Sequence, residues 1–222
     1  MRTFKKDKKG RGNLADLTLD VNIKKIGEFL NQKSEKNDMA QTQSKMLPLG
    51  TVAPSFRLKG TDKKIINFEE SQGKLGYLVM FICNHCPFVK HIRSQLAKLT
   101  SEYIEKRIGV FGINSNDIVN YPEDDFSNMI NEKKQQNYLF DYLLDETQNV
   151  AKAYQAACTP DFFLFNSNKK LVYRGQFDDS RPGNKIPVTG NDLKLAMDAI
   201  LNRAPVSQNQ KPSIGCNIKW KN

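Results

Sequence analysis

Apolar residues form two continuous runs near the middle of the chain, and a helical pattern lies between them. Tyr77–Ile82 is an apolar run rich in aromatic and branched residues, which predicts a buried strand. From Val89 to Ile104, apolar side chains recur every three or four positions with charged residues between them, which predicts an amphipathic helix. Ile108–Ile113 is the second apolar run and predicts a second core strand.

Weaker patterns on both sides extend this order of elements. Gly50–Leu58 matches G-x-x-A-P-x-F-x-L, and a turn at Gly60–Asp62 followed by a return strand at Lys64–Phe68 predicts an N-terminal β-hairpin. The later predicted elements are a helix at 124–136, a strand at 140–144, a helix from 150 to 157 capped by Asp145 or Thr147, a hairpin at 162–174, and a last helix that begins at Thr189 or Asn191 and carries apolar residues to Leu201. The predicted fold class is therefore α/β, with a central mixed β-sheet flanked by helices.

The two ends of the chain differ in charge from its middle. The formal net charge is +10 over 222 residues; residues 1–45 carry eleven Lys or Arg against six Asp or Glu, and 201–222 carry four Lys or Arg and no acid. Basic ends without interleaved aromatic residues predict no nucleic-acid partner. The sequence contains neither a signal-peptide core nor a membrane span, so no membrane partner is predicted. We predict a mobile basic extension at 1–45, a folded domain at 46–205, and a C-terminal tail at 206–222 that contains Cys216.

Two cysteines stand at the first predicted strand-to-helix junction. Cys83 and Cys86 form a C-x-x-C pair, and Pro87 follows at once. Unpaired N–H groups and the dipole at a helix start favour a thiolate, and two thiols at this spacing can close a small disulfide. A dithiol redox centre is the leading hypothesis. His85 lies between the cysteines; its protonated imidazole would stabilise the Cys83 thiolate, or else it faces solvent with no electrostatic role.

Two other interpretations of the cysteine pair stay open. A structural zinc site often begins with C-x-x-C, but it usually adds a second Cys or His pair at short spacing, and Cys158, Cys216 and His91 are scattered. The pair could also be two inert core residues, because free cysteine is among the most buried residue types. Four irregularly spaced cysteines favour a reducing compartment, so the predicted localisation is cytoplasmic.

This order of elements, with C-x-x-C at the first core junction, resembles the thioredoxin-like fold. Within that fold the chain resembles the redoxin or AhpC/TSA (peroxiredoxin-like) superfamily, with a C-N-H-C-P centre. The segments that carry the resemblance lie between Leu47 and Trp220 and are Gly50–Leu58, Phe81–His91, Cys158–Pro160 and Pro212–Trp220. The resemblance implies that Thr159-Pro160 is a cis-proline element beside the active-site sulfurs, where an extended substrate can pair with the backbone. It also implies that Cys158 is close to the redox pair, and it makes Cys216 a candidate resolving thiol.

The resemblance implies an oxidoreductase that acts on disulfides. In thioredoxin geometry Cys83 is the more exposed thiol and attacks a protein or small-molecule disulfide, after which Cys86 resolves the mixed disulfide. The predicted catalytic set is Cys83, Cys86, His85, Thr159 and Pro160, with Cys158 and Cys216 as additional redox thiols. An external thiol would return the electrons. No bound cofactor or metal is predicted, since no nucleotide or flavin motif is present.

A thiol-dependent peroxidase with an antioxidant role is the alternative function. In that case Cys86 or Cys83 would become a sulfenic acid and the other cysteine would condense with it. Peroxiredoxins carry P-x-x-x-T-x-x-C, and aligning Cys86 with their peroxidatic cysteine places Cys83 at the Thr position and Val79 at the Pro position. The peroxide-binding pattern is therefore broken. A metal-binding protein and an inactive interaction module with the same fold are the remaining alternatives.

Overall fold

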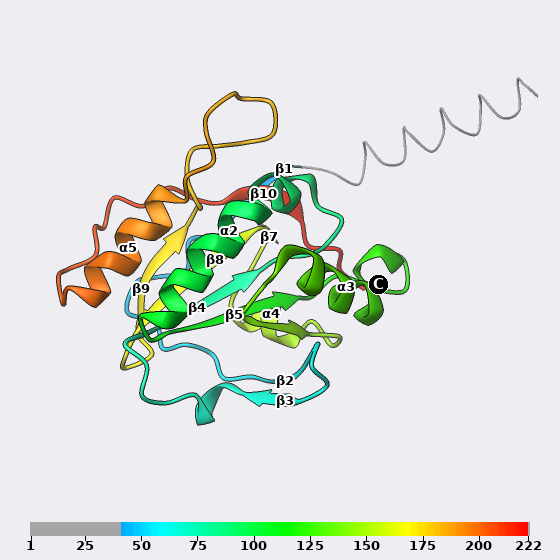
Figure 1. Cartoon of the computed structure of the whole chain (residues 1–222), viewed down its shortest axis with the longest axis horizontal. Helices are drawn as coiled ribbons and strands as arrows, with labels where there is room; N and C mark the ends of the chain where they lie inside the picture. The colour runs from blue at the N-terminus through cyan, green and yellow to red at the C-terminus, as the bar shows by residue number, and fades with distance from the viewer. Residues whose placement is uncertain (1–40, 222) are drawn as a thin grey trace, which may run out of the picture. The chain divides into compact units, whose positions relative to one another are not determined.

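The structure, a computed structural model, describes residues 41–221, and a seven-stranded mixed sheet lies at its centre (Figure 1). The strands follow one another across the sheet in the order β3 (Ile65–Asn67), β2 (Arg57–Gly60), β6 (Asp141–Leu144), β5 (Ile108–Asn114), β4 (Gly76–Phe81), β8 (Asp161–Asn166) and β9 (Leu171–Gly175). Strands β4, β5 and β6 are parallel, and the other pairings are antiparallel. This confirms the predicted central mixed sheet, and β2 and β3 form the N-terminal hairpin.

Strand β4 is apolar along its whole length because both of its faces are covered. Leu78 and Met80 point into one core, whereas Tyr77, Val79 and Phe81 point into the other. The first core is closed by α2 (Pro87–Glu105), α3 (Phe126–Gln136) and α5 (Asn191–Leu201), and the second by α4 (Asn149–Ala153) and the 3-10 turn η1 (Phe68–Glu70). A strand buried on both faces has a continuous rather than an alternating apolar pattern.

Two helix boundaries differ from the predicted ones. Helix α3 begins at Phe126 rather than at Asp124, because the Asp125 carboxylate accepts the Asn128 N–H at 2.7 Å and caps the helix. Asp124 instead ends a separate 3-10 turn, η2 (Pro122–Asp124). Helix α4 stops at Ala153, since Gln155 has a φ of 53° in the left-handed region. Within residues 41–221, no helix is both long enough and apolar enough to cross a membrane.

A second, smaller sheet adjoins the end of α2 at which the two cysteines lie. It contains β1 (Gln41–Gln43), β10 (Ile214–Asn217) and β7 (Cys158–Thr159), with β10 in the middle and antiparallel to both neighbours. This sheet is not predicted by the sequence patterns, since β1 is polar and β7 has only two residues. The predicted division of the chain at residues 46 and 206 stays a prediction, and residues 1–40 of the proposed extension lie outside the described part.

Candidate dithiol active site

Cys83 and Cys86 lie where β4 ends and α2 begins. Cys86 is the N-cap residue of α2, and Pro87 is its first helical residue, a position at which the missing proline N–H costs nothing. The Lys90 N–H donates to Cys86 O at 2.9 Å and closes the first turn. Both cysteine side chains are buried, with exposed fractions of 2% for Cys83 and 0% for Cys86. Cys86 therefore stands at the helix end where N–H groups have no partner within the helix.

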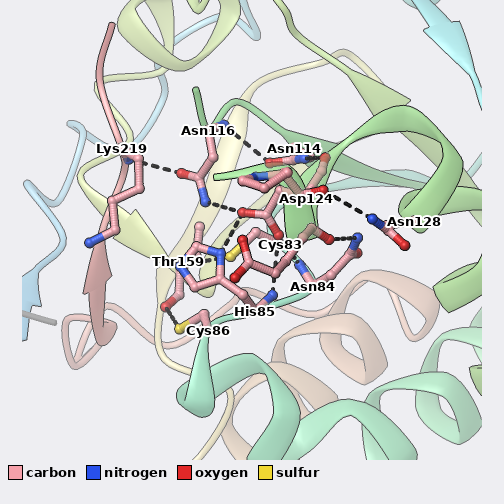
Figure 2. A network of polar contacts seen from close by, with 12 residues as sticks. Cys83, Asn84, His85, Cys86, Asn114, Asn116, Asp124, Asn128, Thr159 and Lys219 are labelled. Carbon is pink, nitrogen blue, oxygen red and sulfur yellow. Dashed lines mark hydrogen bonds and ion pairs between the residues drawn. The ribbon is translucent and has the colours of Figure 1, made fainter. Parts of the chain in front are cut away.

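The backbone between β7 and β8 brings Thr159 against both sulfurs (Figure 2). Cys83 Sγ lies 3.5 Å from Thr159 Oγ1, and the protonated Cys86 thiol donates to Thr159 O at 3.1 Å. The Thr159-Pro160 peptide bond is cis. The structure thus gathers Cys83, Cys86 and Thr159 at one point, with Pro160 next in the chain.

The surroundings of the two thiols push their pKa values apart. Burial by itself would raise the pKa of Cys86, but hydrogen bonds from Cys216 and Cys83 outweigh burial and lower this pKa. The backbone N–H of Val89, in the first turn of α2, acts in the same direction. Burial raises the pKa of Cys83 well above its ordinary value, and the hydrogen bond to Cys86 and the charge of Asp124 add to the rise. Cys86 is therefore the thiol that ionises first.

The pKa directions favour Cys86 as the thiolate, whereas the resemblance implies that Cys83 is the attacking thiol. Cys83 and Cys86 are equally inaccessible, and the pKa of Cys83 shifts in the direction that keeps it protonated. The physical reason is the start of α2. The helix begins after Cys86, three residues later than a helix start at Cys83 would require, so its free N–H groups lie near the second cysteine.

His85 is hydrogen-bonded to a carboxylate, and one of its ring nitrogens also lies within 4.8 Å of Cys83 Sγ. His85 Nδ1 lies 2.6 Å from Asp124 Oδ2, and the imidazole stacks on Tyr121 with ring centroids 5.6 Å apart. Burial would lower the pKa of His85, but the hydrogen bond and charge of Asp124 outweigh it and raise this pKa; the charge of Cys86 adds to the rise. A protonated His85 therefore favours the Cys86 thiolate through space.

Asp124 is the buried centre of this polar network, and sequence reasoning missed it by placing it in a helix. Its carboxylate accepts the backbone N–H of Asn84 at 2.8 Å, the backbone N–H of His85 at 3.1 Å and Asn116 Nδ2 at 2.8 Å (Figure 2). Asn114 Nδ2 donates a hydrogen bond to the backbone carbonyl oxygen of Asp124 at 2.8 Å. A signal was present in the sequence: Asn114 and Asn116 stand at the end of β5, and the carboxyl ends of adjacent parallel strands meet at one edge of the sheet.

The two remaining cysteines differ in how they relate to the pair. Cys216 lies opposite Thr159 across the β10–β7 pairing and makes a hydrogen bond to Cys86, which together with burial raises the pKa of Cys216. Cys158 is also buried, but its thiol donates to Pro160 O at 3.6 Å, and burial raises its pKa as well. The structure thus brings Cys216, but not Cys158, into contact with Cys86.

The sequence and the fold both have known relatives. Residues 49–174, more than half of the chain, match the AhpC/TSA family. The chain belongs to the AhpC/TSA family. An uncharacterized conserved protein from Geobacillus kaustophilus is 51% identical, with a TM-score of 0.81 over 82% of this chain and 97% of that chain. A hypothetical protein from Sinorhizobium meliloti is 48% identical, with a TM-score of 0.80 over 81% of this chain and 98% of that chain. None of the curated proteins that were compared matches the sequence significantly.

More distant structures identify the fold of this AhpC/TSA protein. The thioredoxin domain of a thiol-disulfide oxidoreductase from Bacteroides vulgatus has a TM-score of 0.52 and 17% identity, over 67% of this chain and 96% of that domain. Likeness at this identity shows the fold alone. It confirms the predicted thioredoxin-like fold, and the family match confirms the predicted resemblance to the redoxin superfamily.

This AhpC/TSA chain supplies a threonine hydroxyl to its cysteines from an unexpected place. Cys83 stands three residues before Cys86, where the peroxiredoxin pattern has threonine, but the Thr159 hydroxyl from β7 lies 3.5 Å from Cys83 Sγ. Val79, at the position of the pattern's proline, points into the second core. The site therefore has Cys83 at the threonine position of the pattern and takes a threonine hydroxyl, that of Thr159, from strand β7.

Cys83, His85 and Asp124 also form a group with metal-binding donor atoms. Their sulfur, nitrogen and oxygen atoms lie within 4.8 Å of one another, and such donors suit zinc. However, His85 Nδ1 and Asp124 Oδ2 are hydrogen-bonded to each other, and a shared metal would have to break that bond. Metal ligation would also require Cys83 as a thiolate, against the direction of its pKa shift. The geometry favours a redox pair over a metal centre.

The raised pKa of His85 predicts how its contribution to stability depends on pH. Because the folded-state pKa lies above 6.5, pairing with Asp124 stabilises the fold fully below pH 6.5, and the contribution declines as pH rises through the folded-state pKa. We expect the loss of unfolding free energy in His85→Asn to be larger at pH 5.5 than at pH 8.5. Urea unfolding of both proteins at each pH measures this difference; a loss that grows with pH would contradict the pairing.

Proposed function

We propose that this protein is a thiol–disulfide oxidoreductase whose redox couple is Cys83 and Cys86. The observation that carries the proposal is the position of the two buried cysteines where β4 ends and α2 begins, with both sulfurs against Thr159. Loss of two electrons and the remaining proton from such a pair forms a disulfide. Membership of the AhpC/TSA family supports redox chemistry, and four free cysteines fit a reducing compartment such as the cytoplasm.

The proposed reaction begins at Cys86. Its thiolate attacks one sulfur of a substrate disulfide, the substrate's S–S bond breaks, and one substrate sulfur leaves as a thiolate that takes up a proton. Cys83 then gives up its proton and attacks Cys86 Sγ, which releases the second substrate sulfur. The substrate has gained two electrons and two protons, and the protein holds a Cys83–Cys86 disulfide. An external thiol donor returns the pair to the dithiol.

A redox titration with cysteine variants tests this proposal. We expect protein equilibrated in glutathione redox buffers and then alkylated to lose two alkyl groups per oxidised pair and to titrate as one two-electron couple, with roughly 30 mV per tenfold change in the oxidised-to-reduced ratio. Cys86→Ser should abolish substrate reduction. Cys83→Ser should instead keep the attack by Cys86 on the substrate disulfide and lose the Cys83–Cys86 disulfide. Cys158→Ser is the control: it removes a buried cysteine whose thiol donates a hydrogen bond to Pro160 O, and it should keep the two-electron titration. Reactivity that survives in Cys86→Ser but is lost in Cys83→Ser would reverse the assigned roles.

The Thr159 hydroxyl supports a second candidate function, a thiol peroxidase. A hydroxyl 3.5 Å from Cys83 could hold a peroxide oxygen, and buried thiols are more accessible to a peroxide than to a larger disulfide. The Cys86 thiolate would take one peroxide oxygen to form a sulfenic acid while the other oxygen leaves as water or an alcohol. Cys83 would then condense with the sulfenic acid, releasing water and forming the same disulfide.

Stopped-flow consumption of hydrogen peroxide distinguishes the two candidate functions. If disulfide exchange is the main activity, we expect peroxide to oxidise the dithiol slowly and Thr159→Val to leave that rate unchanged. Rapid, saturable peroxide turnover that is lost in both Cys86→Ser and Thr159→Val would favour the peroxidase.

A further inference from the structure

Strand β10 occupies the edge of β7, which is the edge where an extended substrate was expected to pair. In the antiparallel register, Cys216 lies opposite Thr159 and Asn217 lies opposite Cys158. The approach is close: a Cβ atom added to Gly215 would lie 2.0 Å from the Thr159 carbonyl oxygen. The protein's own C-terminal segment is therefore bound to the backbone beside the active-site sulfurs.

Hydrogen bonds on both sides of β10 fix this segment in place. Before the strand, the Ser213 N–H donates to Ser44 Oγ at 3.0 Å. After the strand, the Ile218 N–H donates to Ala157 O at 3.2 Å, and the Lys219 N–H donates to Asn116 Oδ1 at 2.9 Å. Asn116 in turn donates to Asp124, so the segment after β10 is joined to the same network that holds His85 (Figure 2).

The fixed strand carries a third sulfur to Cys86. Cys83, Cys86 and Cys216 belong to one buried cluster; Cys83 and Cys86 both contact Thr159, and Cys216 lies opposite Thr159 in the β10–β7 pairing. Cys86, the thiol whose pKa is lowered, thus has two neighbouring thiols, Cys83 and Cys216, whose pKa values are raised. Cys86 is therefore the shared neighbour of Cys83 and Cys216 in this cluster.

We propose that Cys216 is a second resolving thiol, so that Cys86 forms a disulfide with either Cys83 or Cys216. This inference rests on the proposed function, because it takes the oxidised Cys83–Cys86 pair as its starting state. Cys216 loses its proton and attacks Cys86 Sγ; the Cys83–Cys86 bond breaks, a Cys86–Cys216 bond forms, and Cys83 leaves as a thiolate that takes up a proton. One S–S bond replaces another, so the exchange needs no oxidant. Strand β10 thereby delivers a catalytic group as well as covering the site.

The sequence makes the two disulfides easy to tell apart by peptide mapping. Cys83 and Cys86 share one tryptic peptide, residues 75–90, because no Lys or Arg lies between them. Cys216 lies in the peptide 204–219 and Cys158 in the peptide 153–169. A Cys83–Cys86 bond is therefore internal to one peptide, whereas a Cys86–Cys216 bond joins two peptides that would otherwise separate.

The test compares wild-type protein with Cys83→Ser, Cys83→Ser/Cys216→Ser and Cys83→Ser/Cys158→Ser after treatment with oxidised glutathione, alkylation and digestion. In Cys83→Ser, and equally in Cys83→Ser/Cys158→Ser, we expect most molecules to join 75–90 to 204–219. In Cys83→Ser/Cys216→Ser, we expect only glutathione attached to Cys86. Cys83→Ala serves in the same role if Cys83→Ser does not fold, as judged by circular dichroism.

The outcomes separate this inference from the proposed function. If wild-type protein forms the Cys83–Cys86 bond but Cys83→Ser holds only glutathione on Cys86, Cys216 is not a resolving thiol and the proposed function stands. If wild-type protein forms no bond within 75–90, the proposed redox couple is wrong. In that case a Cys86–Cys216 bond in wild-type protein would identify Cys216 as the principal partner of Cys86.

Discussion

Replacing Asp124 with asparagine is expected to lower the free energy of unfolding by about 3–5 kcal/mol, the range for breaking a buried, hydrogen-bonded ion pair. Asp124 is fully buried, and each of its carboxylate oxygens accepts two hydrogen bonds. One oxygen serves the backbone N–H groups of Asn84 and His85, and the other serves His85 Nδ1 and Asn116 Nδ2. An asparagine side chain presents an N–H₂ donor at one of these two positions. Whichever way the amide is turned, it faces donors, so buried polar groups lose their partners.

Urea unfolding at pH 6 measures this loss, and the neighbouring Glu123→Gln is the matched control. The Glu123 side chain is exposed, so its neutralisation should change stability by no more than about 0.5 kcal/mol. In Asp124→Asn, an NMR titration should also find the pKa of His85 lower than in the unmodified protein, since Asp124 is what raises it against burial. A stability change below about 1 kcal/mol, with an unaltered His85 titration, would remove Asp124 from the centre of the network.

The main elements of the fold are predictable because their patterns are strong. A six-residue apolar run can only be a strand buried on both faces or part of a buried helix, and its length and branched residues favour the strand. Strand β4 and helix α2 follow directly from this reasoning, and the hairpin formed by β8 and β9 follows from two such runs joined by a short turn. The exact helix starts are less predictable. Asp124 and Asp125 are equally good caps by sequence, and only the folded network decides between them.

The part of the candidate site formed by residues adjacent in sequence is predictable, whereas the part formed by residues far away in the sequence is much less so. Cys83, His85 and Cys86 share one turn, so their proximity follows from spacing. The contribution of β10 does not follow in this way, since Ile214–Asn217 is a short segment in a polar context that becomes buried only by pairing with β7. Such pairing is a non-local contact, which no periodicity within the segment specifies.

The relative acidity of Cys83 and Cys86 shows the same division between local and non-local causes. The helix start is a local feature, and it identifies a place where a thiolate is favoured. Which of two nearby thiols benefits depends on donors from distant parts of the chain. Cys216 supplies one such donor to Cys86, whereas Asp124 places a negative charge near Cys83. The resemblance to thioredoxin geometry implies the opposite assignment, and the spacing of the cysteines does not decide between the two because neither partner is close in sequence.

Gly215→Ala is expected to separate β10 from β7 and to expose the active-site sulfurs. The added Cβ would lie 2.0 Å from the Thr159 carbonyl oxygen and 2.6 Å from its carbon, distances that only a backbone shift can relieve. Overpacking of this kind costs roughly 1–3 kcal/mol. If about 1.4 kcal/mol of this cost is relieved by detaching β10, the population of the open state, and with it the rate of thiol alkylation, rises about tenfold.

The experiment follows iodoacetamide labelling of the reduced protein by mass spectrometry, with Gly73→Ala as the control. Gly73 has a φ of +70° with open space around it, so alanine there strains the backbone without pressing on β10. We expect faster labelling of Cys86 and Cys216 in Gly215→Ala and no change in Gly73→Ala. In the Cys83→Ser background, Gly215→Ala should also reduce the Cys86–Cys216 disulfide, because the strand no longer holds the two sulfurs together. Unchanged labelling and an undiminished disulfide would mean that β10 neither covers the site nor positions Cys216.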